Sequence, residues 1–323
     1  MMLSTIPLFI PIVTTYTVSS LKMPLEHLMT DSRRLAGTFL HYYEKMGFDC
    51  FPILGESTFN AEAFGCRIGY HTHEPLVIDP LHFSTREAVD QHPVADLSCC
   101  RTNQVYLGAV KRISGETRRR GPVIASSTAP LTTVSQIIGL ENMLRQMIRD
   151  PGVILALVDK VTDLIIRYSR ELLNAGAHMI FVADPVASPA LVSPQMFRTF
   201  ALPGLKRLMS AIPCPTILHI CGDIIPIIHD MMEIEFTILS LDQCIRVKKV
   251  RDLLGKDPVL GGNIDPGHVL FDKTPDAVAE ASRQCFKEGG PENFVLMPGC
   301  TIVPGTPVDN IRAMMKAARE VRS

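Results

Sequence analysis

Short apolar runs alternate with longer amphipathic stretches along nearly the whole chain, and this alternation constrains the fold more than any other feature of the sequence. Eight strands are predicted, at residues 8–13, 50–54, 123–127, 179–183, 216–220, 237–241, 259–262 and 294–297. Helices are predicted from amphipathic patterns at residues 31–47, 133–176, 193–211, 223–233, 246–255, 274–288 and 307–321. Strict alternation implies parallel strands joined by helical crossovers, and eight strands predict an α/β fold of the closed (β/α)8, or TIM-barrel, type.

A long segment after the second predicted strand interrupts this rhythm. Residues 55–121 are rich in His, Pro and Gly and end in a basic run at 118–120, so they are predicted to form an elaborated loop with a short helix near 85–92. Long loops that follow the strands of such barrels usually build or cover the active site. The segment is therefore expected to shape the barrel mouth.

Length and charge limit the kinds of function open to the chain. Its 323 residues, 46% of them hydrophobic, can bury one large core, so the whole chain, 1–323, is predicted to be a single barrel domain. The 32 Lys and Arg residues nearly balance the 33 Asp and Glu residues, which leaves no field of one sign to attract nucleic acid or an anionic membrane. The expected substrate is small or carried on a protein.

The N-terminus and the cysteines bear on location. The apolar N-terminus is broken by Pro7 and Pro11 and lacks a basic leading region, so it is interpreted as a buried strand and not as a signal peptide. No segment approaches the roughly 18 uninterrupted apolar residues of a membrane span. The nine cysteines are odd in number and scattered, unlike the disulfide framework of a small secreted domain. A reducing, cytoplasmic location is expected.

A pair of soft metal ligands stands at the end of the fifth predicted strand, in the stretch TILHICGDIIPII. His219 and Cys221 are two residues apart, so in a strand they point to the same side. Cys300 follows the last predicted strand and is expected at the same mouth. One imidazole and two thiolates favour Zn²⁺ with a fourth position open for chemistry. Spacing alone leaves another interpretation open, in which the cysteines belong to the core and the histidine is only hydrogen-bonded.

Acidic and amide residues at other strand ends form a second group of candidates. Glu56 is the first choice for a fourth, resting zinc ligand. Asp184, Asp242, Asn263 and Asp265 are predicted as catalytic residues at the mouth. The alternative for any carboxylate in this group is to fill the fourth zinc position or to bond the ring nitrogen of His219 that faces away from the metal. Asp184 and Asp265 each precede a proline, so a role in a turn or at a helix start is the alternative for these two.

Several motifs resemble one known family. The stretches HICGDIIPIIHDM, LSLDQ, GGNIDP and FVLMPGCTIVPGTPVDNIRAM are similar to those of the methylcobamide:coenzyme M (thiol) methyltransferases, within the uroporphyrinogen decarboxylase superfamily. GESTFNAEAFGC and FVADPVASPALVSPQMFRTFALPGLKRL resemble the same group, so the similarity spans nearly the whole chain. In that family a His-x-Cys pair and a distant Cys bind catalytic zinc, which implies His219, Cys221 and Cys300 as ligands here.

The resemblance implies a zinc-dependent, corrinoid-linked methyltransferase. It would move a methyl group between a methylcobamide and a small thiol activated as a zinc thiolate, by in-line displacement at the methyl group. Two cysteinates cancel the two charges of Zn²⁺, so a bound thiolate keeps its electron density for attack. The chain lacks an Asp-x-His-x-x-Gly signature for corrinoid binding. The methylated corrinoid is therefore expected as a co-substrate on a separate corrinoid-binding protein.

Other functions are also compatible with the sequence. A demethylating methyltransferase of the same fold would move methyl from a methoxylated or methylamine-type substrate to the corrinoid protein. A decarboxylase of the superfamily carries an Arg-Gln-Ala-Gly-Arg signature, but the corresponding stretch here is IPIVTTYTVSS, which leaves the many carboxylates of its tetrapyrrole substrate without partners. A metal-free lyase or binding barrel would use the cysteines only as core. The sequence leaves open the thiol, the direction of transfer, the corrinoid partner and the oligomeric state, a homodimer included.

Overall fold

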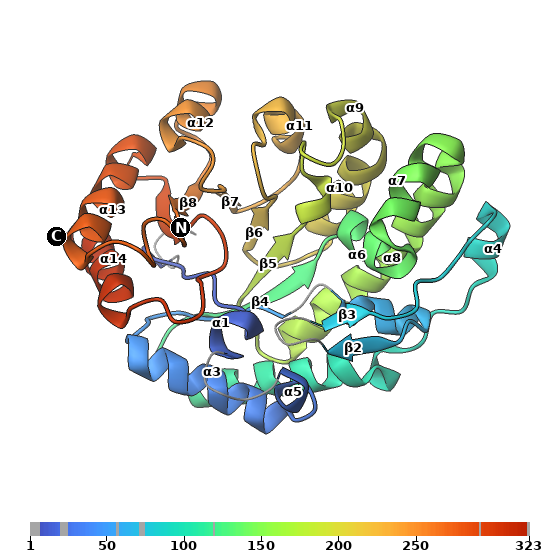
Figure 1. The fold of residues 1–323 in the computed structure, drawn as a ribbon, viewed down its shortest axis with the longest axis horizontal. Helices are drawn as coiled ribbons and strands as arrows, with labels where there is room; N and C mark the ends of the chain where they lie inside the picture. The colour runs from blue at the N-terminus through green and yellow to red at the C-terminus, as the bar shows by residue number, and fades with distance from the viewer. Residues whose placement is uncertain are drawn as a thin grey trace.

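A curled parallel sheet with helices around its outside forms the centre of the molecule (Figure 1). The computed structural model describes residues 7–19, 25–55, 58–70, 75–118, 120–290 and 292–321. The sheet has seven strands in the order β1-β4-β5-β6-β7-β8-β9, and every neighbouring pair is parallel. Their bounds are β1 Phe51–Ile53, β4 Val123–Thr128, β5 Met179–Ala183, β6 Thr216–His219, β7 Ile238–Ser240, β8 Leu260–Ile264 and β9 Phe294–Pro298. This α/β architecture is in line with a TIM-barrel-like fold.

The segment predicted as the first strand, 8–13, is not a regular strand, and in this respect the prediction of eight strands is wrong for the described residues. The segment makes one isolated bridge at each edge of the sheet, Phe9 to Leu296 of β9 and Thr14 to Leu54 beside β1. Pro11 has no N–H group to donate, so the segment cannot form a continuous ladder. It lies between the two edge strands and joins them without extending the sheet.

Two groups of buried side chains lie on the two sides of the sheet. The larger packs between the strands and the surrounding helices. The smaller combines alternate residues of the strands with two from the bridging segment, and includes Ile10, Ile12, Ile124, Ile217, Ile238 and Val295. Because neighbouring residues of a strand face opposite sides, this second group fills the concave side, as packed layers do inside a barrel.

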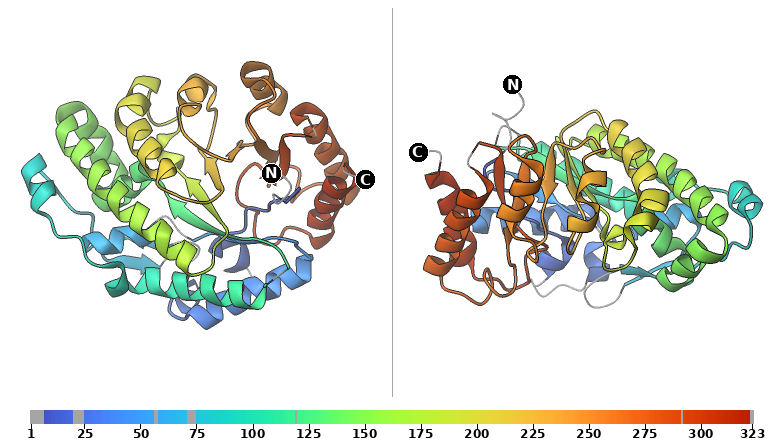
Figure 2. Two further views of the ribbon diagram at one scale, coloured as in Figure 1. Left: turned by 180° about the vertical axis from the view of Figure 1, so that it is seen from behind. Right: turned by 90° about the horizontal axis from the view of Figure 1, so that it is seen from above.

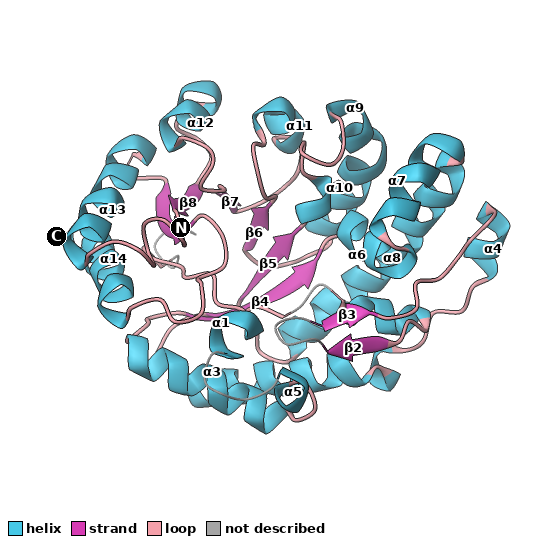
Figure 3. Ribbon diagram, viewed as in Figure 1, coloured by secondary structure: helices cyan, strands magenta, loops and turns pink. Residues whose placement is uncertain are grey.

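The helices cover the convex side in every view (Figure 2; cyan in Figure 3). The helix bounds are α1 Thr15–Ser19, α2 Leu25–Leu28, α3 Ser32–Met46, α4 Arg86–Gln91, α5 Arg101–Glu116, α6 Pro130–Ile138, α7 Leu140–Arg149, α8 Pro151–Asn174, α9 Pro194–Met196, α10 Leu202–Ser210, α11 Ile228–Met231, α12 Val247–Leu254, α13 Pro275–Gly289 and α14 Val308–Glu320. The sequence dictates their ends directly in α3, where the Asp31 side chain accepts from the first-turn N–H groups and Gly47 closes the helix at φ 79°. No helix among these residues combines the length and apolar composition needed to cross a bilayer.

The single helix predicted at 133–176 is three helices, α6, α7 and α8. Gly139, at φ 81°, separates the first two, and Pro151 begins the third. A left-handed glycine ends a helix, and a proline is tolerated only in a first turn, so both breaks follow from local chemistry.

The segment 55–121 is more regular than predicted. The short helix expected near 85–92 is confirmed as α4. The rest contains an antiparallel hairpin, β2 (Ile68–Tyr70) with β3 (Pro75–Val77), and the 16-residue helix α5, so the description of this segment as a loop is wrong for those parts. Gly108 lies inside α5, and a Cβ there would lie 2.8 Å from Ser32 of α3. The glycine allows α5 to pack closely on α3.

Candidate metal centre

Three donor side chains come together at the carboxyl end of the sheet. His219 is the last residue of β6, Cys221 follows two residues later, and Cys300 lies two residues beyond β9. Parallel strands end at one edge of the sheet, so residues remote in sequence meet there. The ligand atoms of His219, Cys221 and Cys300 all lie within 4.8 Å of one another, and no other such group of three occurs among the described residues.

The geometry of this group, here called the donor cluster, suits a tetrahedral ion. The Cys221 sulfur lies 3.4 Å from Nε2 of His219. Ligand atoms about 2.0–2.3 Å from a tetrahedral Zn²⁺ are about 3.5 Å apart, so this separation is close to one edge of such a site. His219 is buried, while Cys221 and Cys300 are half-buried, which leaves one side of the cluster accessible.

The imidazole of His219 is held from two sides. Its Nδ1 lies 3.1 Å from the Ser240 hydroxyl, and its ring packs against Phe181 with 5.9 Å between ring centroids. A metal-binding histidine usually has its second ring nitrogen hydrogen-bonded in this way, which fixes the ring and leaves the other nitrogen for the ion.

The contact between the two thiols shifts their pKa values in opposite directions. The hydrogen bond from Cys221, together with His219, lowers the pKa of Cys300 to about 4. That same bond, burial, and the charges of Cys300, Asp242 and Asp184 raise the pKa of Cys221 well above its ordinary value. Two thiolates this close repel each other, so holding both ionised requires a compensating cation.

Asp242 binds backbone around the donor cluster. Its Oδ2 accepts from the Gly222 N–H at 2.9 Å, and its Oδ1 accepts from the Cys244 N–H at 2.9 Å. Gly222 directly follows Cys221 and has φ 83°, a conformation that favours glycine. The carboxylate therefore fixes the turn that carries the Cys221 sulfur.

Asp184 is also beside the donor cluster. Its N–H donates to the His219 carbonyl at 2.9 Å, and its Oδ1 accepts from the Thr132 N–H at 3.0 Å and the Thr132 hydroxyl at 2.6 Å. Oδ2 is buried and has no partner within the part of the chain that the structure describes. Burial raises the pKa of this carboxyl to about 7, against the hydrogen bonds from Thr132, which lower it.

The other two predicted substrate residues bond to nearby groups. The Asn263 amide donates to the Asp242 carbonyl at 2.8 Å and also to that of Ile245. Asp265 Oδ1 accepts from the Gly267 and His268 N–H groups, both at 2.8 Å, as in a turn. The structure thus shows no bond from either side chain to the donor cluster.

Glu56, the predicted fourth ligand, lies outside the described residues. The preceding Gly55 is held by Ser126 and Tyr106, whose hydroxyls accept from its N–H at 2.7 and 3.2 Å. Neither Tyr106 nor Ser240 was predicted from the sequence. A serine in a strand is common, and the contact of Ser240 with His219 depends on a residue of the neighbouring strand.

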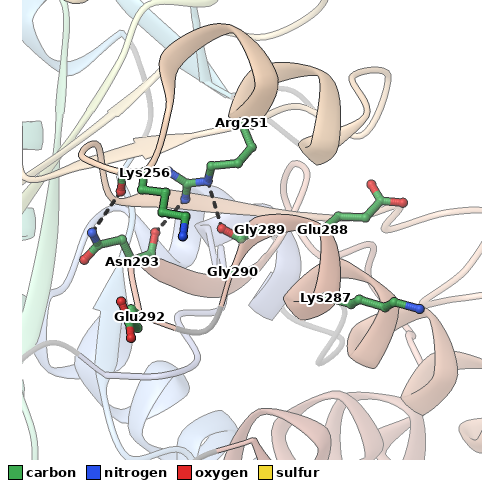
Figure 4. A pocket seen from close by; sticks show the side chains of 8 residues that line it. All are labelled: Arg251, Lys256, Lys287, Glu288, Gly289, Gly290, Glu292 and Asn293. Atoms are coloured by element: carbon green, nitrogen blue, oxygen red, sulfur yellow. Dashed lines mark hydrogen bonds between the residues drawn. The ribbon is translucent and has the colours of Figure 1, made fainter.

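A cavity of about 360 Å³ lies at the opposite, amino end of β8 and β9 (Figure 4). The Arg251 guanidinium beside it donates to backbone carbonyls at 2.8 to 3.0 Å, those of Gly255, Pro258, Gly289 and Asn293. These bonds tie α12 to the strand connections. In a barrel-like fold, this end usually supports stability, and chemistry occurs at the other.

Comparison with known proteins gives a consistent set of relatives. The uroporphyrinogen decarboxylase (URO-D) family model matches residues 9–321. The chain is 30% identical over 291 residues to a methylated-thiol–coenzyme M methyltransferase of Methanosarcina mazei, covering 90% of this chain and 77% of that protein. It is 30% identical over 300 residues to a methylcobamide:CoM methyltransferase of Methanosarcina barkeri, covering 90% and 85%. A solved methyltransferase from Methanosarcina mazei superposes with a TM-score of 0.88 at 27% identity, covering 99% of this chain and 95% of that one.

Proposed function

Because the chain belongs to the uroporphyrinogen decarboxylase family and is a methyltransferase, we propose that it transfers a methyl group between a methylated corrinoid and a small thiol activated at a zinc ion. The corrinoid would be presented by a separate corrinoid-binding protein. The observation that carries the proposal is the meeting of His219, Cys221 and Cys300 within 4.8 Å at the carboxyl end of the sheet. Relatives named as methylcobamide:CoM methyltransferases support the choice of reaction.

The donor set suits zinc that activates a thiol. His219 would bind through Nε2, and Cys221 and Cys300 through their sulfurs, which gives one neutral and two anionic ligands. Zn²⁺ bound there would supply the Lewis acidity that brings the pKa of a substrate thiol toward neutrality. The two sulfurs contribute enough negative charge to keep the site from being strongly cationic, so they preserve the nucleophilicity of the incoming sulfur.

Burial of the donor cluster matters for the methyl transfer itself. His219 is buried and Ser240 fully so, and the cysteines are half-buried, so the thiol would react with little water around it on the sheet side. Displacement at a methyl group needs the attacking sulfur and the leaving corrinoid in line. The donor cluster would therefore hold the thiol on the sheet side, and the partner protein would present the corrinoid on the accessible side of the cluster.

Rim residues would complete the site. Asp184 is the one whose contacts best suit a substrate-facing role, because its buried Oδ2 has no partner among the described residues. Asp242, Asn263 and Asp265 would shape the rim by holding backbone groups around it. Glu56 is retained as the proposed fourth ligand in the absence of thiol.

The direct test is demethylation of free methylcobalamin by candidate thiols, followed by the change in cobalt absorbance. The proposal expects a reaction that requires both thiol and zinc, and that is lost after chelation and restored by added zinc. His219→Ala should show no restoration. Zinc-independent demethylation, or methylation of reduced cobalamin by a methylamine or methoxylated substrate without any thiol reaction, would contradict it.

A further inference from the structure

We infer that Ser240, the last residue of β7, and Asp242, two residues beyond it, are positioning residues for the zinc ligands at the end of β6. This inference rests on the proposed function and extends it to two side chains that would not touch the ion. Both lie at the carboxyl end of β7, the strand that pairs with β6 in parallel.

The register of the two strands matches the two residues to the two ligands. His219 pairs directly with Ser240. Cys221 lies two residues beyond His219 and shares the donor cluster with it, and Asp242, two residues beyond Ser240, bonds to the Gly222 N–H next to Cys221. Each of the two side chains therefore lies beside the part of the chain that carries one ligand.

Ser240 holds the His219 ring through Nδ1 and can accept from Nδ1–H, which leaves Nε2 free for an ion. Its hydroxyl is fully buried and lies 3.1 Å from His219 Nδ1. A neutral imidazole has one protonated and one unprotonated nitrogen. When the hydroxyl accepts from Nδ1–H, the lone pair is on Nε2, the nitrogen that faces Cys221 at 3.4 Å. Loss of the hydroxyl would release the ring and leave Nδ1–H buried without this partner.

Asp242 acts on the other ligand through the backbone. Its two carboxylate oxygens accept from the N–H groups of Gly222 and Cys244, each at 2.9 Å, and so join the turn after β6 to the turn after β7. The turn after β6 begins at Cys221, whose sulfur is in the donor cluster. Without both bonds, the Cys221 sulfur would sample more positions and bind the ion less tightly.

The experiment measures zinc affinity by competition with a chromogenic chelator in wild type, Ser240→Ala and Asp242→Asn. Groups that orient metal ligands typically contribute about 10–100-fold to metal affinity, so Ser240→Ala should lower zinc affinity by that amount. Asp242→Asn keeps one acceptor oxygen and should lower it by about 10-fold.

Ser282→Ala is the matched control. Ser282 is fully buried like Ser240, but its hydroxyl donates at 2.7 Å to the Val278 carbonyl within α13. Its removal should change the thermal stability of the zinc-free protein only slightly, because such a bond adds little to a helix, and should leave zinc affinity unchanged. The visible ligand-field spectrum of Co²⁺ in place of zinc should change in Ser240→Ala and not in Ser282→Ala, which separates positioning from a general loss of stability.

The outcomes are distinguishable. Zinc bound tightly by wild type, with Ser240→Ala and Asp242→Asn within about two-fold of it, would overturn the positioning role and leave the proposed function standing. Equal losses of affinity in Ser240→Ala and Ser282→Ala would overturn it as well. A wild-type protein that binds no zinc would overturn both the inference and the proposed function.

Discussion

The two ends of the parallel sheet differ in whether their polar side chains have hydrogen-bond partners. At the amino end, the Arg251 guanidinium donates to four backbone carbonyls, so this charged group is fully bonded to the backbone. At the carboxyl end, the donor cluster brings two thiols and an imidazole together, and the buried Oδ2 of Asp184 has no partner among the described residues.

This difference suits the amino end to stability and the carboxyl end to ligand binding. Buried polar atoms without partners cost free energy unless something else satisfies them. In barrel-like folds the amino end usually supports stability and the carboxyl end carries the chemistry, and the contacts of Arg251 and of the donor cluster are consistent with that division. Substitutions at the two ends should accordingly affect different measurements.

The largest effect is expected from the donor cluster. Cys300→Ser removes one of two anionic sulfur ligands, so it should abolish stoichiometric zinc and lower kcat/KM for thiol-dependent demethylation by about 1000-fold or more, equivalent to about 4 kcal/mol. Metal analysis measures the zinc content, and the methylcobalamin assay measures kcat/KM. Cys214→Ser is the matched control, because Cys214 is also half-buried but precedes β6 at the amino end. Equal loss of zinc in both variants would contradict the location of the zinc site at the carboxyl end of the sheet.

A pH-dependent effect is expected from Asp184. Burial raises the pKa of this carboxyl from 3.8 to about 7, so the folded chain holds the proton more tightly than the unfolded chain. The associated stability is fully present below about pH 4 and is lost as the pH rises through about 7, by up to about 4 kcal/mol.

Asp184→Asn should therefore flatten the dependence of stability on pH in this interval, measured by urea unfolding of the metal-free protein from pH 4 to 8. The variant carries no titrating group at 184, and its oxygen can still accept from Thr132. Parallel wild-type and variant curves would show that this buried carboxyl is ionised throughout.

An effect on stability alone is expected from Arg251. Arg251→Met keeps much of the apolar stem but leaves the carbonyls around the amino-end cavity without their charged donor, at a cost of about 3 kcal/mol in unfolding free energy. Zinc affinity and kcat/KM should stay within about two-fold of wild type. Lys249→Met, an exposed change on the same helix, should cost less than about 0.5 kcal/mol. A loss of zinc in Arg251→Met would show that the two ends are coupled.

The smallest effect is expected at Asp265. Asp265→Ala removes the acceptor for the Gly267 and His268 N–H groups and should cost about 1 kcal/mol of stability. Thiol-dependent demethylation should change by less than about two-fold, because this side chain holds backbone at the rim and no described bond joins it to the donor cluster. A selective rise in KM for the thiol would instead support the substrate contact predicted from the sequence.

The donor cluster was predictable because its signals are local and its geometry is generic. His219 and Cys221 share a side through the period of a strand, and Cys300 follows another strand, so the parallel fold alone brings them to one edge. Ser240 gave no such signal, since a serine in a strand is common and its role depends on a partner in the neighbouring strand.

The fold was predictable where apolar periodicity was uninterrupted. The strands from β4 to β9 occur close to their predicted positions. The segment 8–13 was misjudged because its apolar pattern is that of a strand while Pro11 prevents a ladder. Helix α5 was missed because it lies in a segment whose length and His, Pro and Gly content indicated a loop, whereas its Gly108 allows close packing on α3.

The most direct test of the central claim is X-ray absorption at the zinc edge of the purified, zinc-loaded protein. The account predicts one zinc per chain with two sulfurs at about 2.3 Å and one imidazole nitrogen at about 2.0–2.1 Å, and the loss of one sulfur from whatever metal remains in Cys300→Ser. Zinc surrounded only by oxygen and nitrogen would contradict it.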